Sequence, residues 1–136
     1  MNPNFDIDLV ESRIEKVKNL VGYESKLAEL EKEKAEYEAQ PSLFREWMKL
    51  RNKARNLYHE ALRMYLVEMK VVEDSFTSPE TIKEGYGCTE SEFEANYKMV
   101  AAREAYLKAL DEANTFAKEN EVPGSMEIKL IPFFFF

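Results

Sequence analysis

His59 and Cys88 are the only histidine and the only cysteine in this sequence, and both side chains could take part in nucleophilic chemistry. A thiol nucleophile needs an imidazole or another base within hydrogen-bond reach. Nothing in the spacing of the two residues predicts that they meet. Cys88 also precedes a helix start, where it could form a hydrophobic staple onto Phe93. We therefore interpret Cys88 as a packing residue.

Metal and nucleotide sites lack their usual ligands. One histidine and one cysteine cannot form the clusters that bind zinc, and no Glu-x-x-His pair of the kind found in carboxylate-bridged iron sites occurs. The run Gly85-Tyr-Gly87 lacks the third glycine and the lysine of phosphate-binding loops. Carboxylates are plentiful, but on charged helix faces they are usually solvated. The sequence predicts a protein that is not an enzyme and uses no cofactor and no metal.

A short basic stretch contains Arg45, Lys49, Arg51, Lys53 and Arg55. With Trp47 and Tyr58 nearby, it could follow a phosphate backbone and stack a base, as a weak nucleic-acid-binding recombination factor would. Alternatively, a helical hairpin about Gln40-Pro41 would set four acidic residues opposite four of these cations, from Glu36 with Arg45 to Glu29 with Lys53. We favour this intramolecular pairing. The net charge of −7 also makes nucleic acid an unlikely partner.

Residues 123–136, here called the tail, have a different pattern. Apolar and charged residues alternate from Met126 to Leu130, and four phenylalanines follow at 133–136. The alternation predicts a strand that leads into an aromatic plug. A lone strand needs another strand for its backbone hydrogen bonds, so we expect it to pair with Phe5–Leu9 or with an edge on a neighbouring molecule. The predicted partner-binding residues are Ile128, Leu130, Ile131, Phe133, Phe134, Phe135 and Phe136.

Part of the tail resembles the C-terminal peptides that dock on DNA sliding clamps. Their pattern is glutamine, two residues, an aliphatic residue, two residues and two aromatics. Here it reads Glu127-x-x-Leu130-x-x-Phe133-Phe134. The sequence departs from it in having glutamate for glutamine, Pro132 within the turn and two further phenylalanines. The resemblance covers fewer than ten residues. It implies a replication or repair accessory whose Leu130, Phe133 and Phe134 enter the clamp pocket.

Three long segments carry apolar residues at the three- and four-residue spacing of helices. The first covers about residues 9–39, and its apolar phase shifts at Gly22, where we expect a kink. Gln40-Pro41-Ser42 interrupts it, because proline disfavours helix in the residue before it and serine caps a new helix. The second segment covers about residues 42–75. Its apolar stripe is wide enough to face two neighbours.

The third helix is expected over about residues 89–120, where Thr89-x-x-Glu92 forms a capping box. A short helical turn is expected before it at 79–84. Alanines recur along its apolar stripe, which indicates close approach to another helix. At the other end of the chain, Phe5, Ile7 and Leu9 alternate with aspartates in a strand-like pattern, although an opening helix is an alternative reading of the same residues.

Three features of the sequence indicate the compartment in which the protein is expected to occur. The acidic N-terminal residues lack the basic region and apolar run of a signal peptide. The apolar stretch from Leu130 to Phe136 is shorter than the ~20 residues that a transmembrane helix needs. A single cysteine excludes an intrachain disulfide. We expect a cytoplasmic protein, or one within a virus particle, with no membrane contact.

The predicted fold class is mainly α, with three long antiparallel helices in a coiled-coil-like hairpin or bundle and short extended or β termini. Residues 1–122 are expected to form the helical body and residues 123–136 an extended docking tail. The predicted function is that of a non-enzymatic structural or assembly protein, such as a viral structural or accessory protein, which docks to itself or to a larger complex through the tail. The alternative is a regulatory binding module, such as a clamp-binding accessory or an inhibitor of a host protein.

Overall fold

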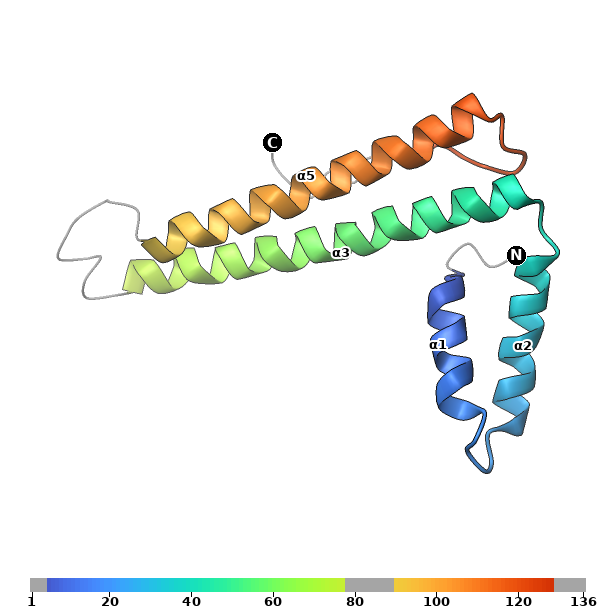
Figure 1. Ribbon diagram of the computed structural model, residues 1–136. Coiled ribbons are helices and arrows are strands. Elements are labelled where there is room, and N and C mark those ends of the chain that lie inside the picture. The colour runs from blue at the N-terminus through green and yellow to red at the C-terminus, as the bar shows by residue number, and fades with distance from the viewer. Residues whose placement is uncertain (1–4, 78–89, 129–136) are drawn as a thin grey trace. The chain divides into compact units, whose positions relative to one another are not determined.

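The structure, a computed structural model, describes residues 5–77 and 90–128, and 82% of these residues are helical. Its helices are α1 (Ile7–Val17), α2 (Glu24–Glu38), α3 (Ser42–Thr77) and α5 (Glu90–Glu119) (Figure 1). The prediction of a mainly helical protein is confirmed. No strand occurs in residues 5–77 or 90–128. The predicted turn at 79–84 and residues 129–136 of the predicted tail lie outside the described residues.

The chain divides into two compact units. The first unit contains residues up to Asn52 together with those from Ala113 onward, and the second unit contains Lys53–Glu112. The first unit therefore includes α1, α2, the start of α3 and the end of α5. The remainder of α3 and α5 makes up the second unit.

One long helix was predicted where the structure has two, α1 and α2, which lie side by side (Figure 1). The backbone N–H of Leu20 donates to the carbonyl of Val17 at 3.0 Å just after α1. Gly22 then adopts φ +90°, a left-handed conformation that glycine reaches without steric cost. The phase shift at Gly22 is therefore a chain reversal between two helices, and the predicted kink was wrong.

Of the two readings of Phe5–Leu9, the opening helix is confirmed and the strand is wrong, because α1 begins at Ile7. One carboxylate oxygen of Asp6 accepts from the backbone N–H of Asp8 at 3.0 Å and of Leu9 at 3.3 Å, which is a helix N-cap. Phe5 and Ile7 are buried, whereas Leu9 is 47% exposed. The alternation thus ends where the helical period begins, and the tail has no strand at residues 5–9 to pair with.

The core of the first unit joins segments that are distant in sequence. The rings of Phe5 and Tyr37 stack with centroids 5.3 Å apart. Trp47, from the first turns of α3, lies in the same buried cluster, as does Val122, which follows α5. The side-chain amide of Asn52 donates to the carbonyl of Phe5 at 3.0 Å, a buried hydrogen bond that ties the N-terminal residues to α3.

Burial raises the pKa of the Tyr37 hydroxyl, and the nearby carboxylates of Asp8 and Glu11 act in the same direction, while Arg45 opposes them. A raised pKa in the folded state means that Tyr37 stabilises the fold fully below the unfolded pKa of about 10. This contribution is lost as the pH rises through the folded pKa.

We therefore expect the urea midpoint of unfolding to fall above about pH 10, and to fall less in Tyr37→Phe. Urea titrations at several alkaline pH values would measure the change in this midpoint. Tyr23→Phe is the matched control, because Tyr23 is 50% exposed. An equal fall of the midpoint at alkaline pH in wild type and Tyr37→Phe would contradict the raised pKa of Tyr37 as its cause.

In the second unit, α3 and α5 run antiparallel, side by side (Figure 1). Their register follows from three contacts: the Tyr58 and Tyr106 rings at 5.5 Å, the Asn96–Glu68 hydrogen bond at 2.8 Å and the Lys53–Glu112 ion pair at 3.6 Å. The residue numbers in each pair add to 164 or 165. The side chains of Ala54, Ala61, Ala95 and Ala109 are buried, which agrees with the close approach predicted from the alanine stripe.

The chain leaves α5 through a Schellman motif. The N–H of Val122 donates to the Ala117 carbonyl at 3.1 Å, and the N–H of Glu121 donates to the Lys118 carbonyl at 3.4 Å. Glu121 has φ +46°, the left-handed position that glycine normally occupies. The motif turns Val122 into the core, where it is 5% exposed. Gly124 follows with φ +81°, and a Cβ there would lie 3.3 Å from the Phe44 ring.

Replacing Glu121 with glycine is expected to stabilise the protein by about 1 kcal/mol, because a left-handed residue with a Cβ is strained. Urea denaturation would measure the gain. Glu119→Gly is the matched control: Glu119 is exposed and helical, so glycine there should cost roughly 1 kcal/mol. Destabilisation by both substitutions would show that the conformation of Glu121 carries no strain.

Candidate docking site at the base of the tail

Asn114 of α5 holds the beginning of the tail. Its side-chain amide donates to the carbonyl of Ile128 at 2.9 Å, and its side-chain oxygen accepts from the Ile128 N–H at 2.8 Å. Asn114 and Ile128 are both half-buried. A single side chain thus makes the two hydrogen bonds that a neighbouring strand would make to one residue. The tail is bound to its own helix at this point.

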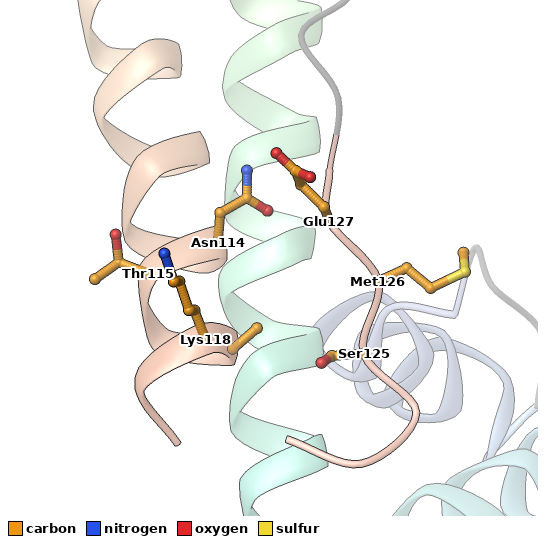
Figure 2. A pocket seen from close by; sticks show the side chains of 7 residues that line it. Asn114, Thr115, Lys118, Ser125, Met126 and Glu127 are labelled. Atoms are coloured by element: carbon orange, nitrogen blue, oxygen red, sulfur yellow. The ribbon is translucent and has the colours of Figure 1, made fainter. Parts of the chain in front are cut away.

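A shallow hollow of about 470 Å³ lies between the last turns of α5 and the tail (Figure 2). It is lined by Asn114, Thr115, Ala117, Lys118, Ser125, Met126 and Glu127. The Ser125 hydroxyl donates to the Val122 carbonyl at 2.6 Å, which fixes the turn at the edge of the hollow. Met126 is 76% exposed. The lining supplies an amine, a carboxylate and amide or hydroxyl groups, which suit hydrogen bonding to a peptide.

Of the predicted partner-binding residues, Ile128 alone lies within the described part of the tail. Its backbone is satisfied by Asn114, and residues 126–128 form no strand. The other six lie outside the described residues: Leu130, Ile131, Phe133, Phe134, Phe135 and Phe136. The sequence pattern did not identify Asn114, because an asparagine beside a helical stripe gives no sign of a distant backbone partner.

The basic residues of the first unit contact nearby groups. The Arg45 guanidinium donates to the carbonyl of Gln40 at 3.2 Å. The Arg51 guanidinium lies 5.3 Å from the centre of the Trp47 ring, a cation–π contact. Lys49 is exposed and lines, with Arg45, a small hollow of about 280 Å³. Arg45 and Arg51 thus have local structural partners.

In the second unit, Lys53 pairs with Glu112 of α5 at 3.6 Å, whereas the predicted hairpin register would set it opposite Glu29. Arg55 also has a partner within the chain. The basic stretch thus contributes to intramolecular contacts, but in Lys53 the partner differs from the predicted one. Nucleic-acid contact through this stretch stays the disfavoured alternative to intramolecular pairing.

Residues considered for catalysis are not brought together in the described part of the chain. His59 is exposed, and its ring lies 5.5 Å from that of its neighbour Tyr58. Cys88 lies outside the described residues. Within residues 5–77 and 90–128, no group of three or more His, Cys, Asp or Glu residues is placed to hold a metal ion.

None of the helices in the described ranges is both long enough and apolar enough to span a membrane. No protein-family model matches the chain, and neither a curated protein nor a solved structure does.

Replacing Asn114 with alanine is expected to release the base of the tail, because two hydrogen bonds are lost and each contributes about 1 kcal/mol. Amide exchange at Ile128 should accelerate roughly tenfold to a hundredfold, with little change in helicity. Hydrogen exchange followed by NMR measures this. Thr115→Ala, an exposed neighbour in the same hollow, is the control and should leave the exchange unchanged. Unaltered exchange in Asn114→Ala would contradict the anchor.

Proposed function

We propose that this protein is a non-enzymatic, helical binding component that engages a protein partner through its tail. The observation that carries the proposal is the pair of hydrogen bonds between Asn114 and the backbone of Ile128. They fix the point at which the tail leaves the helical body. The residues that follow are the most apolar of the chain.

The anchor has an energetic advantage for binding. Ordering a free peptide costs roughly 1–2 kcal/mol per residue in backbone entropy. Residues 123–128 are already held by the turn after α5 and by Asn114, so this cost falls only on the residues beyond them. The anchor therefore favours capture of a partner by Leu130 and Phe133–Phe136.

The chemistry of those residues indicates the kind of partner. Leu130, Ile131 and the four phenylalanines would form a large apolar patch if left in water, and such patches mark interaction sites. A partner that offers an apolar groove would bury them, and each aromatic side chain that is fully buried contributes roughly 1.5–3 kcal/mol. Binding of the tail would then hold the helical body in place within a larger assembly.

Photo-crosslinking tests this proposal directly. Benzoylphenylalanine at Phe134 should crosslink to a protein partner in the cells that make the protein, and the same probe at Leu43 should not. Leu43 is 38% exposed on α3 and serves as the matched control. Leu130→Ala in the probe-bearing protein should reduce the yield. Crosslinks from position 134 only to the protein's own α-helices would show that the tail is a packing element.

A further inference from the structure

The second unit has an apolar surface that its own two helices do not cover. Leu66 is 59% exposed, Met69 is 53% exposed and Phe93 is 70% exposed. These are large apolar side chains on the two helices of one antiparallel pair. Surface clusters of such residues mark binding sites for other proteins.

The helical period places these residues on one side of the pair. The buried residues Ala54 and Ala61 define the heptad d positions of α3, and Met99 and Tyr106 define the a positions of α5. Positions e and b of both helices then lie on the same side of the seam, which is the line of contact between α3 and α5. The reason is that position e of one helix faces position e of the other in an antiparallel pair. The apolar residues of this side that are not buried are Leu62, Leu66, Met69, Phe93, Val100 and Leu107, and this side is here called the open face.

The edges of the open face carry opposite charges. At heptad position f, which borders the face, α3 has Arg63 and Lys70, whereas α5 has Glu104 and Asp111. All four side chains are exposed. Three charged residues lie within the face, Arg55, Glu73 and Arg103, and both arginines already have partners in the chain. Arg63 and Lys70 also pair with acidic residues of their own helix, Glu60 and Asp74. One helix of the face is thus bordered by cations and the other by anions.

We propose that the open face binds the open face of a second copy, with a two-fold axis parallel to the helices, to form an antiparallel four-helix bundle. This axis places α3 of one copy over α5 of the other, so that the basic edge meets the acidic edge. A two-fold axis across the helices would place α3 over α3 and bring basic edges together. Charge complementarity therefore selects the parallel axis.

The parallel axis also fixes the register between copies. Rotation about it leaves each residue at its own level along the bundle, so the contacts between copies follow the same register as the contacts within the chain. Residues whose numbers add to 164 come together, as do Glu68 and Asn96 within one chain. Arg63 of one copy thus lies within one helical turn of the level of Glu104 of the other.

Sedimentation velocity on the full chain tests the face. Wild type should dimerise, and Leu66→Asp with Phe93→Asp should weaken dimerisation by roughly a hundredfold or more, because two charges would be buried. Both side chains are more than half exposed, so the monomer should remain folded. The matched control is Val67→Asp, on the other side of the α3 seam and 44% exposed, which should still dimerise.

A charge exchange tests the axis. Arg63→Glu and Glu104→Arg should each weaken the dimer about tenfold, and the double variant should recover wild-type affinity. The recovery requires α3 to lie over α5 of the other copy. A wild-type protein that stays monomeric at about 100 μM would overturn the proposal, since this interface would then be weaker than typical weak dimers. An unaffected dimer in Leu66→Asp with Phe93→Asp, or a double charge variant without recovery, would also overturn it.

The same measurements on a chain lacking residues 132–136 separate the two proposals. Dimerisation through the open face should persist without these residues. A dimer that disappears with them, while Leu66→Asp with Phe93→Asp has no effect, would assign self-association to the tail. That result would overturn the open-face dimer and leave the proposed function of the tail intact.

Discussion

Trp47→Ala is expected to lower the free energy of unfolding by about 3–5 kcal/mol, among the largest effects of any single substitution in this chain. Trp47 is 3% exposed and lies in the buried cluster of the first unit. Its ring lies 5.6 Å from that of Phe44 and carries the Arg51 guanidinium at 5.3 Å. Alanine would leave a large cavity and remove the surface on which Arg51 rests.

Urea denaturation followed by far-ultraviolet circular dichroism measures this loss. Leu43→Ala is the matched control on the same helix, and its cost should be smaller because Leu43 is 38% exposed. Hydrogen exchange in the same variants should show the largest loss of protection in the first unit. A change below about 1 kcal/mol for Trp47→Ala would mean that α1, α2 and the start of α3 do not share one core.

Two of the helices could be predicted closely from sequence. The second segment was expected over about residues 42–75 and the third over about 89–120, and α3 and α5 cover Ser42–Thr77 and Glu90–Glu119. Both have clear boundaries in sequence: Pro41 before Ser42, and Thr89 with Glu92 as a capping box. Their apolar periods are long, so packing and propensity agree.

The N-terminal third was harder to predict, because two local signals were ambiguous there. A phase shift at Gly22 fits a kinked helix as well as two helices joined by a turn, and the left-handed φ of +90° cannot be read from the sequence. Phe5, Ile7 and Leu9 fit a strand or the start of a helix. The N-cap hydrogen bonds of Asp6 decide for the helix.

Tertiary pairing of charges and amides was not predictable from spacing. Lys53 meets Glu112, which lies 59 residues further along the chain, because of the register between α3 and α5. Exposed ion pairs contribute only ~0–1 kcal/mol, so they follow the packing and do not determine it. The Asn114–Ile128 contact likewise depends on the turn at Glu121–Gly124, whose left-handed residues bring the tail back along α5.

Deletion of residues 132–136 is expected to abolish capture of the protein partner while leaving the helical body intact. The described core of the first unit is formed by residues from Phe5 to Met48 and by Val122, all of which remain in the shortened chain. The Asn114 anchor at Ile128 also remains. The deletion removes all four phenylalanines, so the expected loss of binding exceeds that of Leu130→Ala or Phe133→Ala alone.

The decisive measurement pairs two readings on the full chain and on the chain without residues 132–136. Circular dichroism with thermal unfolding reports the helical body, and pulldown from the cells that make the protein reports the partner. We expect equal helicity and equal melting temperatures, with the partner retained only by the full chain. An unfolded truncation would place the tail in the core, and a folded truncation that still retains the partner would show that the tail is not the docking element.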